Sequence, residues 1–123
     1  MPKRGNPYSA LNKLFHEPNR LAIVSVLCNA TDGITFNELK QECNLTDGNL
    51  SRHLQSLQQA RIIRIKKTFV QSKPQTTIYF TERGRYSFIR YLEALEEVLL
   101  KAAESLGGEK SSGTLPVPKP ARA

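Results

Sequence analysis

Apolar residues recur at helical spacing through the first half of the chain, and this pattern predicts successive helices. A first helix covers residues 9–15 and ends before Pro18, because the residue preceding a proline avoids the α region. Asn19 can cap a second helix. We expect the inward face of this helix to carry Leu21, Val24, Leu27 and Cys28. Asp32 and Gly33 then mark a turn.

A helix-turn-helix is predicted next. Thr35 and Glu38 have the spacing of a capping box, in which each side chain accepts from the backbone N–H of the other residue. We expect the helix that they open to bury Phe36, Leu39 and Cys43. Asn44 suits a left-handed turn, because asparagine tolerates positive φ better than other non-glycine residues. Thr46 then caps a helix over residues 46–60.

The helix over residues 46–60 has an apolar edge and a polar face. At about 100° per residue, the edge consists of Leu50, Leu54, Leu57 and Ala60. The far side holds Gly48, Arg52, Gln55, Ser56 and Gln59. Arg, Gln and Ser side chains can donate hydrogen bonds to base edges in a major groove. The alternative is a solvated face, but such faces usually mix Glu with Lys, and this helix has no acid after Asp47.

Two strands joined by a loop are predicted to follow. Ile63 and Ile65 alternate with Arg64 and Lys66, which predicts one buried face and one basic face. Residues 70–75 are expected to form the hairpin loop. The return strand should direct Ile78 and Phe80 toward the core. An isolated hairpin is marginal in water, so this one must pack on the preceding helices.

The hairpin also carries a concentration of positive charge. Its ammonium groups, on Lys66, Lys67 and Lys73, can follow a phosphate backbone next to a groove. The alternative is a surface hairpin with solubilising lysines. Between Gly48 and Thr81 there is no Asp or Glu, and the whole chain has a net charge of +7 and a pI near 9.7. An acid-free basic run on a folding segment indicates a surface that meets a polyanion, with nucleic acid as the first candidate.

The last helix predicts the oligomeric state. An apolar seam with 4-3-4-3-4 spacing runs through Phe88, Leu92, Leu95, Leu99, Ala102 and Leu106. Tyr91 and Val98 widen it. We expect a second copy of the chain to bury part of this seam. The helix can also pack on its own Leu11, Leu14 and Phe15, and both contacts can coexist. A two-fold dimer would place its two copies of the helix over residues 46–60 roughly 34 Å apart, as an inverted repeat in DNA requires.

Composition sets the boundaries of the folded unit. We expect a basic flexible arm over residues 1–7, one domain over residues 8–106, and a disordered tail rich in Gly, Ser and Pro over residues 107–123. No apolar window is long enough to span a membrane, and no apolar segment of a signal peptide follows the N-terminus. The expected location is the cytoplasm, in association with the nucleoid.

Chemistry other than binding has little support in the sequence. The chain has no glycine-rich phosphate loop, no paired carboxylates with a plausible base and no nucleophile elbow, so we do not expect an enzyme. The candidate metal ligands lack the close spacing of a metal site; they are His16, Cys28, Cys43 and His53. We therefore expect no metal or cofactor. Both cysteines end helices on apolar faces, and a thiol switch between them is a minor alternative.

The order of these elements resembles that of winged-helix transcriptional regulators of the MarR and ArsR type. The resemblance is carried by HEPNRL at 16–21, TFNEL at 35–39, LTDGNLSRHL at 45–54, and the stretch from Lys73-Pro74 to FTERGR at 80–85. It covers nearly all of residues 8–106. It implies a mainly α fold with a small β-hairpin and a long C-terminal dimerisation helix. It also implies a dimer that binds duplex DNA, with helix 46–60 in the major groove and a wing over residues 66–77 on the backbone or minor groove.

Two departures from the family pattern affect what can be carried over. Relatives usually have glycine after the recognition helix, and this chain has Arg61. We infer either a relaxed turn or an added phosphate contact there, and the sequence does not decide between them. The paired-cysteine metal site of arsenical-resistance repressors would fall on the helix over residues 35–43. Only Cys43 is present there, so metal sensing is not carried over.

These observations predict a sequence-specific regulator of transcription that binds double-stranded DNA. We expect a homodimeric repressor that reads an inverted repeat, since no activation module is evident. The expected base-reading residues are Thr46, Gly48, Asn49, Ser51, Arg52, Gln55 and Ser56. The expected wing contacts are Arg64, Lys66, Lys67, Gln71, Ser72 and Lys73. The expected dimerisation residues are Leu11, Phe15, Phe88, Tyr91, Leu92, Leu95, Val98, Leu99 and Ala102.

The alternative function is a winged-helix module that docks a protein partner and touches nucleic acid only nonspecifically. The sequence does not name the operator, the regulated genes or the sign of regulation. A small-molecule effector would have to enter the cleft between the dimer helix and the winged core, and no residue pattern supports one.

Overall fold

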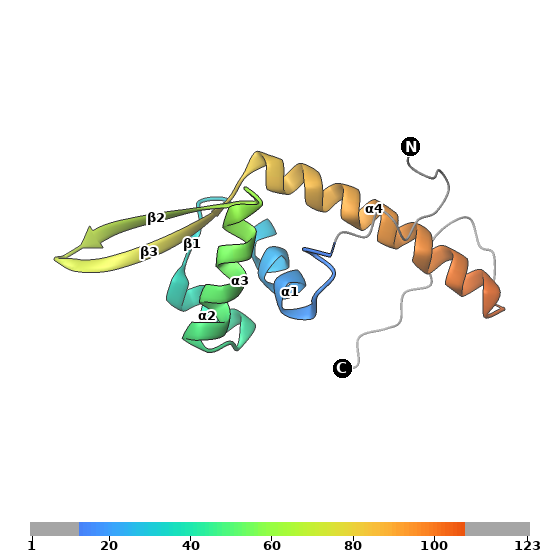
Figure 1. Cartoon of the computed structure of the whole chain (residues 1–123), viewed down its shortest axis with the longest axis horizontal. Coiled ribbons are helices and arrows are strands. Elements are labelled where there is room, and N and C mark those ends of the chain that lie inside the picture. The colour runs from blue at the N-terminus through green and yellow to red at the C-terminus, as the bar shows by residue number, and fades with distance from the viewer. Residues whose placement is uncertain (1–12, 108–123) are drawn as a thin grey trace.

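The computed structural model describes residues 13–107, which form four helices and a three-stranded antiparallel sheet (Figure 1). The elements in chain order are α1 (Pro18–Cys28), β1 (Ile34–Thr35), α2 (Phe36–Cys43), α3 (Asp47–Gln59), β2 (Ile63–Val70), β3 (Lys73–Phe80) and α4 (Glu82–Ser105). The predicted fold class is confirmed. Predictions for the arm, for Leu11 and for residues 108–123 lie outside the described range.

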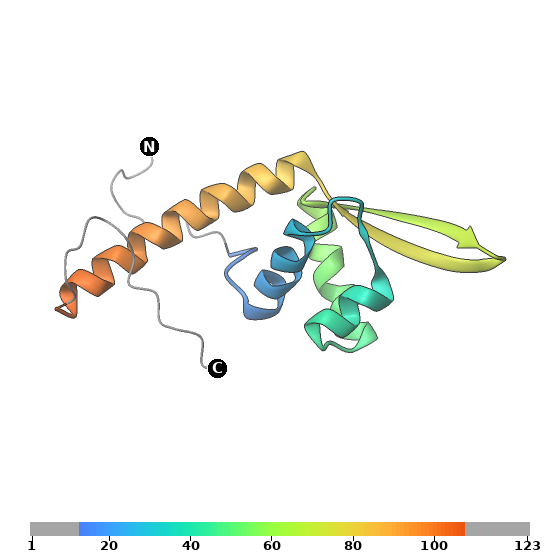
Figure 2. The same ribbon diagram turned by 180° about the vertical axis from the view of Figure 1, so that it is seen from behind.

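The molecule is elongated, and its two ends are built from different elements. Helices α1, α2 and α3 cluster in the middle, β2 and β3 project from one end, and α4 runs past the cluster toward the other (Figures 1 and 2). The same arrangement is seen from both sides. The hairpin and the C-terminal half of α4 therefore present surfaces that point away from each other.

The start of the chain differs from the prediction in two respects. Of the helix predicted over residues 9–15, only residues 13–15 lie in the described range, and they form a turn that places Phe15 fully inside the core. Helix α1 begins at Pro18, and Glu17 caps it by accepting from the Arg20 N–H at 2.8 Å. The Asn19 cap was therefore wrong. Proline lacks an N–H and has a helical φ, so it suits the first helical position and moves the cap one residue earlier.

The inward face of α1 is also rotated from the predicted one. Its buried residues are Ile23, Val24 and Leu27, whereas Cys28 is exposed. The prediction that Cys28 lies on the inward face was therefore wrong. The helix is apolar on most sides, so its sequence pattern does not choose which stripe faces inward.

The helix-turn-helix forms as predicted. Thr35 and Glu38 make both bonds of the capping box, at 3.1 and 3.2 Å. Asn44 is left-handed, with φ 55° and ψ 51°, and it ends α2. Thr46 then caps α3 by accepting from the Asn49 N–H at 3.2 Å. These bonds satisfy backbone groups that the helix ends would otherwise leave unpaired.

The hairpin is longer and tighter than predicted. Strands β2 and β3 pair from Ile63 opposite Phe80 to Val70 opposite Lys73, and only Gln71 and Ser72 lie outside the ladder. The predicted loop over residues 70–75 was therefore wrong. Both turn residues have positive φ, as in the two-residue turn whose twist matches paired strands. The sequence lacks the Asn-Gly or Gly-Gly pair that usually announces such a turn.

Strand β1 was not predicted. It contributes only Ile34 and Thr35, which pair with Ile78 and Thr77 of β3. Two residues are too few for an alternating pattern, so the sequence carries no signal for this strand. It places β3 between β1 and β2 and ties the base of the hairpin to α2.

The core lies between the three short helices, the base of the hairpin and the first half of α4. Its fully buried members include Ile23, Leu39, Leu50, Leu57 and Ile78. An aromatic cluster closes one side, with the ring centroids of Phe15 and Phe88 5.2 Å apart and those of Phe15 and Tyr91 5.6 Å apart. The Tyr91 hydroxyl lies 2.8 Å from His16 Nδ1. This cluster holds α4 on the body of its own chain.

The first turn of α4 is packed directly on backbone. Thr81 caps α4 by accepting from the Gly84 N–H at 2.9 Å, and its own N–H donates to the Ile62 carbonyl at 3.0 Å. A Cβ at Gly84 would lie 2.3 Å from that carbonyl oxygen. Only glycine therefore permits this approach of α4 to the end of α3.

We predict that Gly84→Ala lowers the free energy of unfolding by about 1–3 kcal/mol, because the added methyl must displace backbone instead of a flexible side chain. The measurement is urea unfolding at a fixed protein concentration. Gly48→Ala is the matched control, since nothing lies within 4 Å of a Cβ there. It should gain up to about 1 kcal/mol from helix propensity. Equal stability changes for the two variants would contradict the close approach.

Candidate nucleic-acid interface

Helix α3 turns one face inward and one face to solvent. Leu50, Leu54 and Leu57 are buried in the core. Most of the predicted base-reading residues lie on the opposite side and are exposed, namely Thr46, Gly48, Ser51, Arg52 and Gln55. Asn49 and Ser56 are half-buried at its margins. We call these seven residues the α3 polar face.

Hydrogen bonds within the α3 polar face orient its longest side chain. The Arg52 Nη2 donates to Asn49 Oδ1 at 2.5 Å. The Asn49 N–H in turn donates to Thr46 Oγ1, so the cap and the guanidinium are linked. Six residues of this face line a shallow depression of about 480 Å³. A guanidinium held beside an open depression can make two parallel hydrogen bonds to a planar acceptor.

The hairpin exposes every predicted wing residue, but on two faces. Because side chains alternate along a strand, Arg64 and Lys66 lie on one face and Lys67 lies on the other, with Ile65. The Arg64 guanidinium carbon lies 4.8 Å above the Tyr79 ring, which holds this charge against the outer face of the sheet. Gln71, Ser72 and Lys73 are exposed at the tip.

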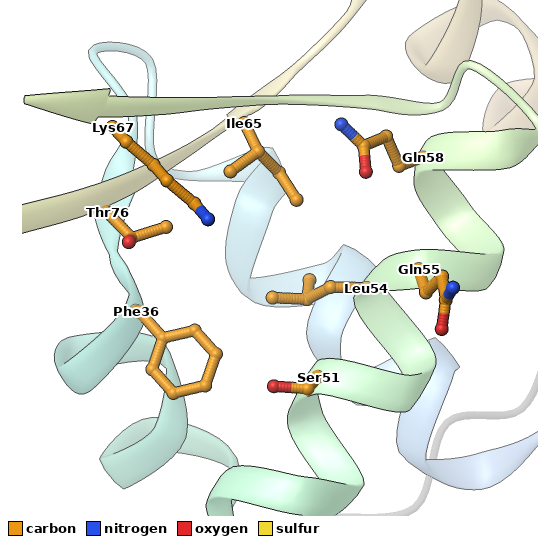
Figure 3. A pocket seen from close by; sticks show the side chains of 8 residues that line it. All are labelled: Phe36, Ser51, Leu54, Gln55, Gln58, Ile65, Lys67 and Thr76. Atoms are coloured by element: carbon orange, nitrogen blue, oxygen red, sulfur yellow. The ribbon is translucent and has the colours of Figure 1, made fainter.

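A cavity of about 270 Å³ separates α3 from the hairpin. Figure 3 shows Lys67 and Ile65 of β2 extending into it from one side and Ser51 and Leu54 of α3 from the other. Gln58 also lines it, and sequence reasoning did not place Gln58 in the site. Only the register of the hairpin against α3 brings this residue to the cavity. The α3 polar face and the inner face of the hairpin thus form one continuous surface.

A family model described as a winged helix DNA-binding domain matches residues 19–99. An uncharacterized protein of Methanocaldococcus jannaschii is 35% identical over 80 residues, covering 65% of this chain and 86% of that protein. The chain belongs to the winged helix DNA-binding domain family. The predicted resemblance to winged-helix regulators is confirmed at this level.

Solved structures show the same fold. The structure of a transcriptional regulator homologue from Pyrococcus horikoshii has a TM-score of 0.68 and 22% identity, covering 77% of this chain and 94% of that one. The M. tuberculosis transcriptional regulator MOSR, solved in complex with DNA, has a TM-score of 0.60 and 16% identity, covering 84% of this chain and 73% of that one. In this fold, α3 is the second helix of the helix-turn-helix and the β2–β3 hairpin is the wing.

The predicted dimerisation residues of this winged-helix protein fall into three groups by burial. Phe15, Phe88 and Tyr91 are buried against one another within the chain. Leu95 and Val98 are half-buried. Leu92, Leu99 and Ala102 are exposed, and so is Ile89, which was not predicted. Only part of the predicted seam is therefore available to a second chain.

Arg61 lies at a left-handed position, with φ 64°. Its N–H donates to the Gln58 carbonyl, and the Ile62 N–H donates to the Leu57 carbonyl, both at 2.9 Å. This pair of bonds is the Schellman ending of a helix, which usually has glycine at the left-handed residue. The relaxed-turn alternative is therefore wrong, and the exposed guanidinium is carried on a strained backbone.

The described chain offers little for other chemistry. Among residues 13–107, no three or more His, Cys, Asp or Glu side chains gather as a metal site would. Within the same range, no helix has both the length and the apolar character needed to cross a membrane. His53 Nδ1 lies 3.9 Å from a Glu17 oxygen, between α3 and the start of α1. Partial burial raises the pKa of the Cys43 thiol, which favours its unreactive protonated form.

We predict that Arg61→Gly raises the free energy of unfolding by about 1 kcal/mol, because glycine adopts the left-handed conformation without a steric penalty. Chemical denaturation provides the measurement. Arg61→Ala keeps the strained backbone and removes the guanidinium, so it should not gain this stability. A gain in the alanine variant equal to that in the glycine variant would show that the guanidinium, and not the backbone, is unfavourable.

Proposed function

We propose that this protein is a sequence-specific regulator of transcription that binds double-stranded DNA, with α3 in the major groove and the wing on the adjoining backbone or minor groove. One observation carries the proposal: the exposed, acid-free α3 polar face continues onto a basic wing. The family description and the DNA complex of MOSR support it. Arg52 and Gln55 would contact base edges, and Lys66 and Lys73 would contact phosphates.

The few acids near this surface are already engaged. Asp47, in the first turn of α3, forms an ion pair with Lys40 at 2.8 Å. Glu38 is used in the capping box. The exposed groups left on the α3 polar face are therefore neutral or cationic. Such a surface gains free energy by releasing counterions from DNA, whatever the base sequence.

We also propose that the protein is a homodimer held by α4. At about 100° per residue, Leu99 lies within about 20° of Leu92, whereas Tyr91 lies about 100° away on the side that packs on its own chain. Leu92 and Leu99 are 43% and 46% exposed, and Leu106 is 87% exposed. This apolar row would be buried by the same row of a second copy. Two copies would then present two α3 helices to an inverted repeat.

Repression is the mode of regulation that we propose. Residues 13–107 account for the proposed DNA-binding surface and the proposed dimerisation row, and occupancy of a promoter by such a dimer would block transcription. We propose no small-molecule effector: the pockets lined by α2, α3 and the hairpin lie on the side proposed to bind DNA, and none of their lining residues belongs to α4.

We predict that Arg52→Ala weakens binding to a duplex selected from a random library by about 1–3 kcal/mol and relaxes preference at one base pair. Lys73→Ala should weaken all duplexes alike and reduce the slope of log K against log salt by about one. Fluorescence anisotropy titrations at several salt concentrations measure both effects. If neither substitution alters binding to any duplex, the protein is instead an interaction module for a protein partner.

We predict that Leu92→Gln combined with Leu99→Gln converts the dimer to a monomer, because the amides cannot be satisfied in an apolar contact. Sedimentation equilibrium measures the change in mass. The control is Glu93→Gln combined with Glu97→Gln, which alters exposed positions of the same helix outside the row. A wild-type protein that sediments as a monomer at micromolar concentration would refute the dimer without affecting the DNA-binding proposal.

A further inference from the structure

The outer end of the wing carries an exposed aromatic side chain. Phe69 is 75% exposed and its neighbour Val70 is 47% exposed. Because strand residues alternate, these two side chains lie on opposite faces of the ribbon. A single exposed apolar residue is common and needs no explanation. Three further features indicate a role for Phe69: its neighbours, the turn beyond it and the face of the ribbon on which it lies.

The turn holds Phe69 at a defined place. Gln71 and Ser72 both have positive φ, of 55° and 66°, which is unfavourable for residues other than glycine. With Val70 paired to Lys73, the pair of Phe69 and Pro74 is the last one on its face of the ribbon. The rigid ring of Pro74 is therefore the cross-strand neighbour of Phe69. Proline has no N–H, so at this position β3 offers no donor to another strand.

Phe69 lies on the face of the ribbon that is directed toward α3. Phe69, Lys67 and Ile65 alternate with the outward-facing residues of β2, so they share one face. Lys67 and Ile65 line the cavity that also contains Ser51 and Gln55 of α3 (Figure 3). At about 3.3 Å per residue, Phe69 extends this face roughly 13 Å beyond Ile65. The aromatic side chain thus ends the same surface that begins on the α3 polar face.

We propose that Phe69, backed by Pro74, is an apolar wedge that enters the minor groove next to the major groove occupied by α3 and inserts between two base pairs. The inference rests on the proposed function. Charge favours DNA as the occupant, because Lys67 shares the face of Phe69, Lys73 lies at the tip, and no acid occurs between residues 48 and 81. Apolar side chains inserted into a base step unstack it and kink the duplex, which lets more protein surface touch DNA.

An anionic lipid surface would also attract basic and apolar groups. The α3 polar face argues against it, because Arg52 held by Asn49 and the amide of Gln55 match the edges of bases. A lipid surface presents no fixed base edges that an oriented guanidinium and amide would recognise. The wedge is therefore assigned to a base step that lies under the wing while α3 reads its half-site.

The test uses the full chain and a duplex that the wild-type protein has selected from a random library. The fluorescent adenine analogue 2-aminopurine is placed singly at each A·T pair flanking a half-site. Saturating wild-type protein should raise its fluorescence at one step, because unstacking relieves quenching. Phe69→Ala should abolish the rise at saturation and weaken binding about tenfold, the loss typical of one aromatic–base stack. Val70→Ala is the matched control and should leave both unchanged.

The wedge is overturned if Phe69→Ala shows the wild-type rise, if no position responds to the wild-type protein, or if Val70→Ala loses as much as Phe69→Ala. Arg52→Ala separates the two proposals. If it weakens binding while Phe69→Ala does not, only the wedge fails, and if it has no effect, the proposed function fails. Cosedimentation with phosphatidylserine vesicles that depends on Phe69, without any effect of Phe69→Ala on DNA, would overturn the wedge in favour of a membrane.

Discussion

The rest of the structure depends on the contacts that the backbone carbonyl of Ile62 makes with the start of α4. This carbonyl lies where α3 ends, β2 begins and α4 begins, three elements that meet at one junction in Figure 1. The left-handed Arg61 turns the chain out of α3, and the Ile62 carbonyl then accepts from the Thr81 N–H while Gly84 packs against it. The Thr81 hydroxyl lies within 2.9 Å of the Arg61 and Ile62 carbonyl oxygens. Helix α3, the wing and α4 are therefore joined at one hydrogen-bonded junction.

Much of this architecture could be predicted from local rules. The capping box of Thr35, the left-handed Asn44 and the apolar edge of α3 each depend on residues a few positions apart, and the structure contains all three. Interactions between distant residues left no such signal. Strand β1 exists only because β3 pairs with it, and the placement of Gln58 in the cavity depends on how the hairpin docks on α3.

The hairpin shows why a sequence can indicate the right element with the wrong geometry. Lys73, Pro74 and Gln75 are typical loop residues, yet pairing along β2 extends the strands to Val70 and confines the turn to two strained residues. The ladder bonds outweigh an unfavourable φ at Gln71 and Ser72. The positive charge of the hairpin was easier to predict than the direction in which each lysine side chain points. Lysines on both faces of the ribbon gave one basic run in the sequence, but only Lys67 points into the space beside α3.

The apolar row of α4 differs from the wing tip in the charges around it. Helical spacing predicts that the seam residues are buried, but it does not predict whether their own chain or a second chain buries them. In the structure, Phe88 and Tyr91 pack against Phe15 of the same chain, whereas Leu92 and Leu99 are exposed. From Leu92 onward the helix carries four glutamates and one lysine within the described chain. A polyanion would be repelled there and attracted to the wing. This opposition supports the proposal that α4 contacts a second protein chain and that the α3 polar face and wing contact DNA.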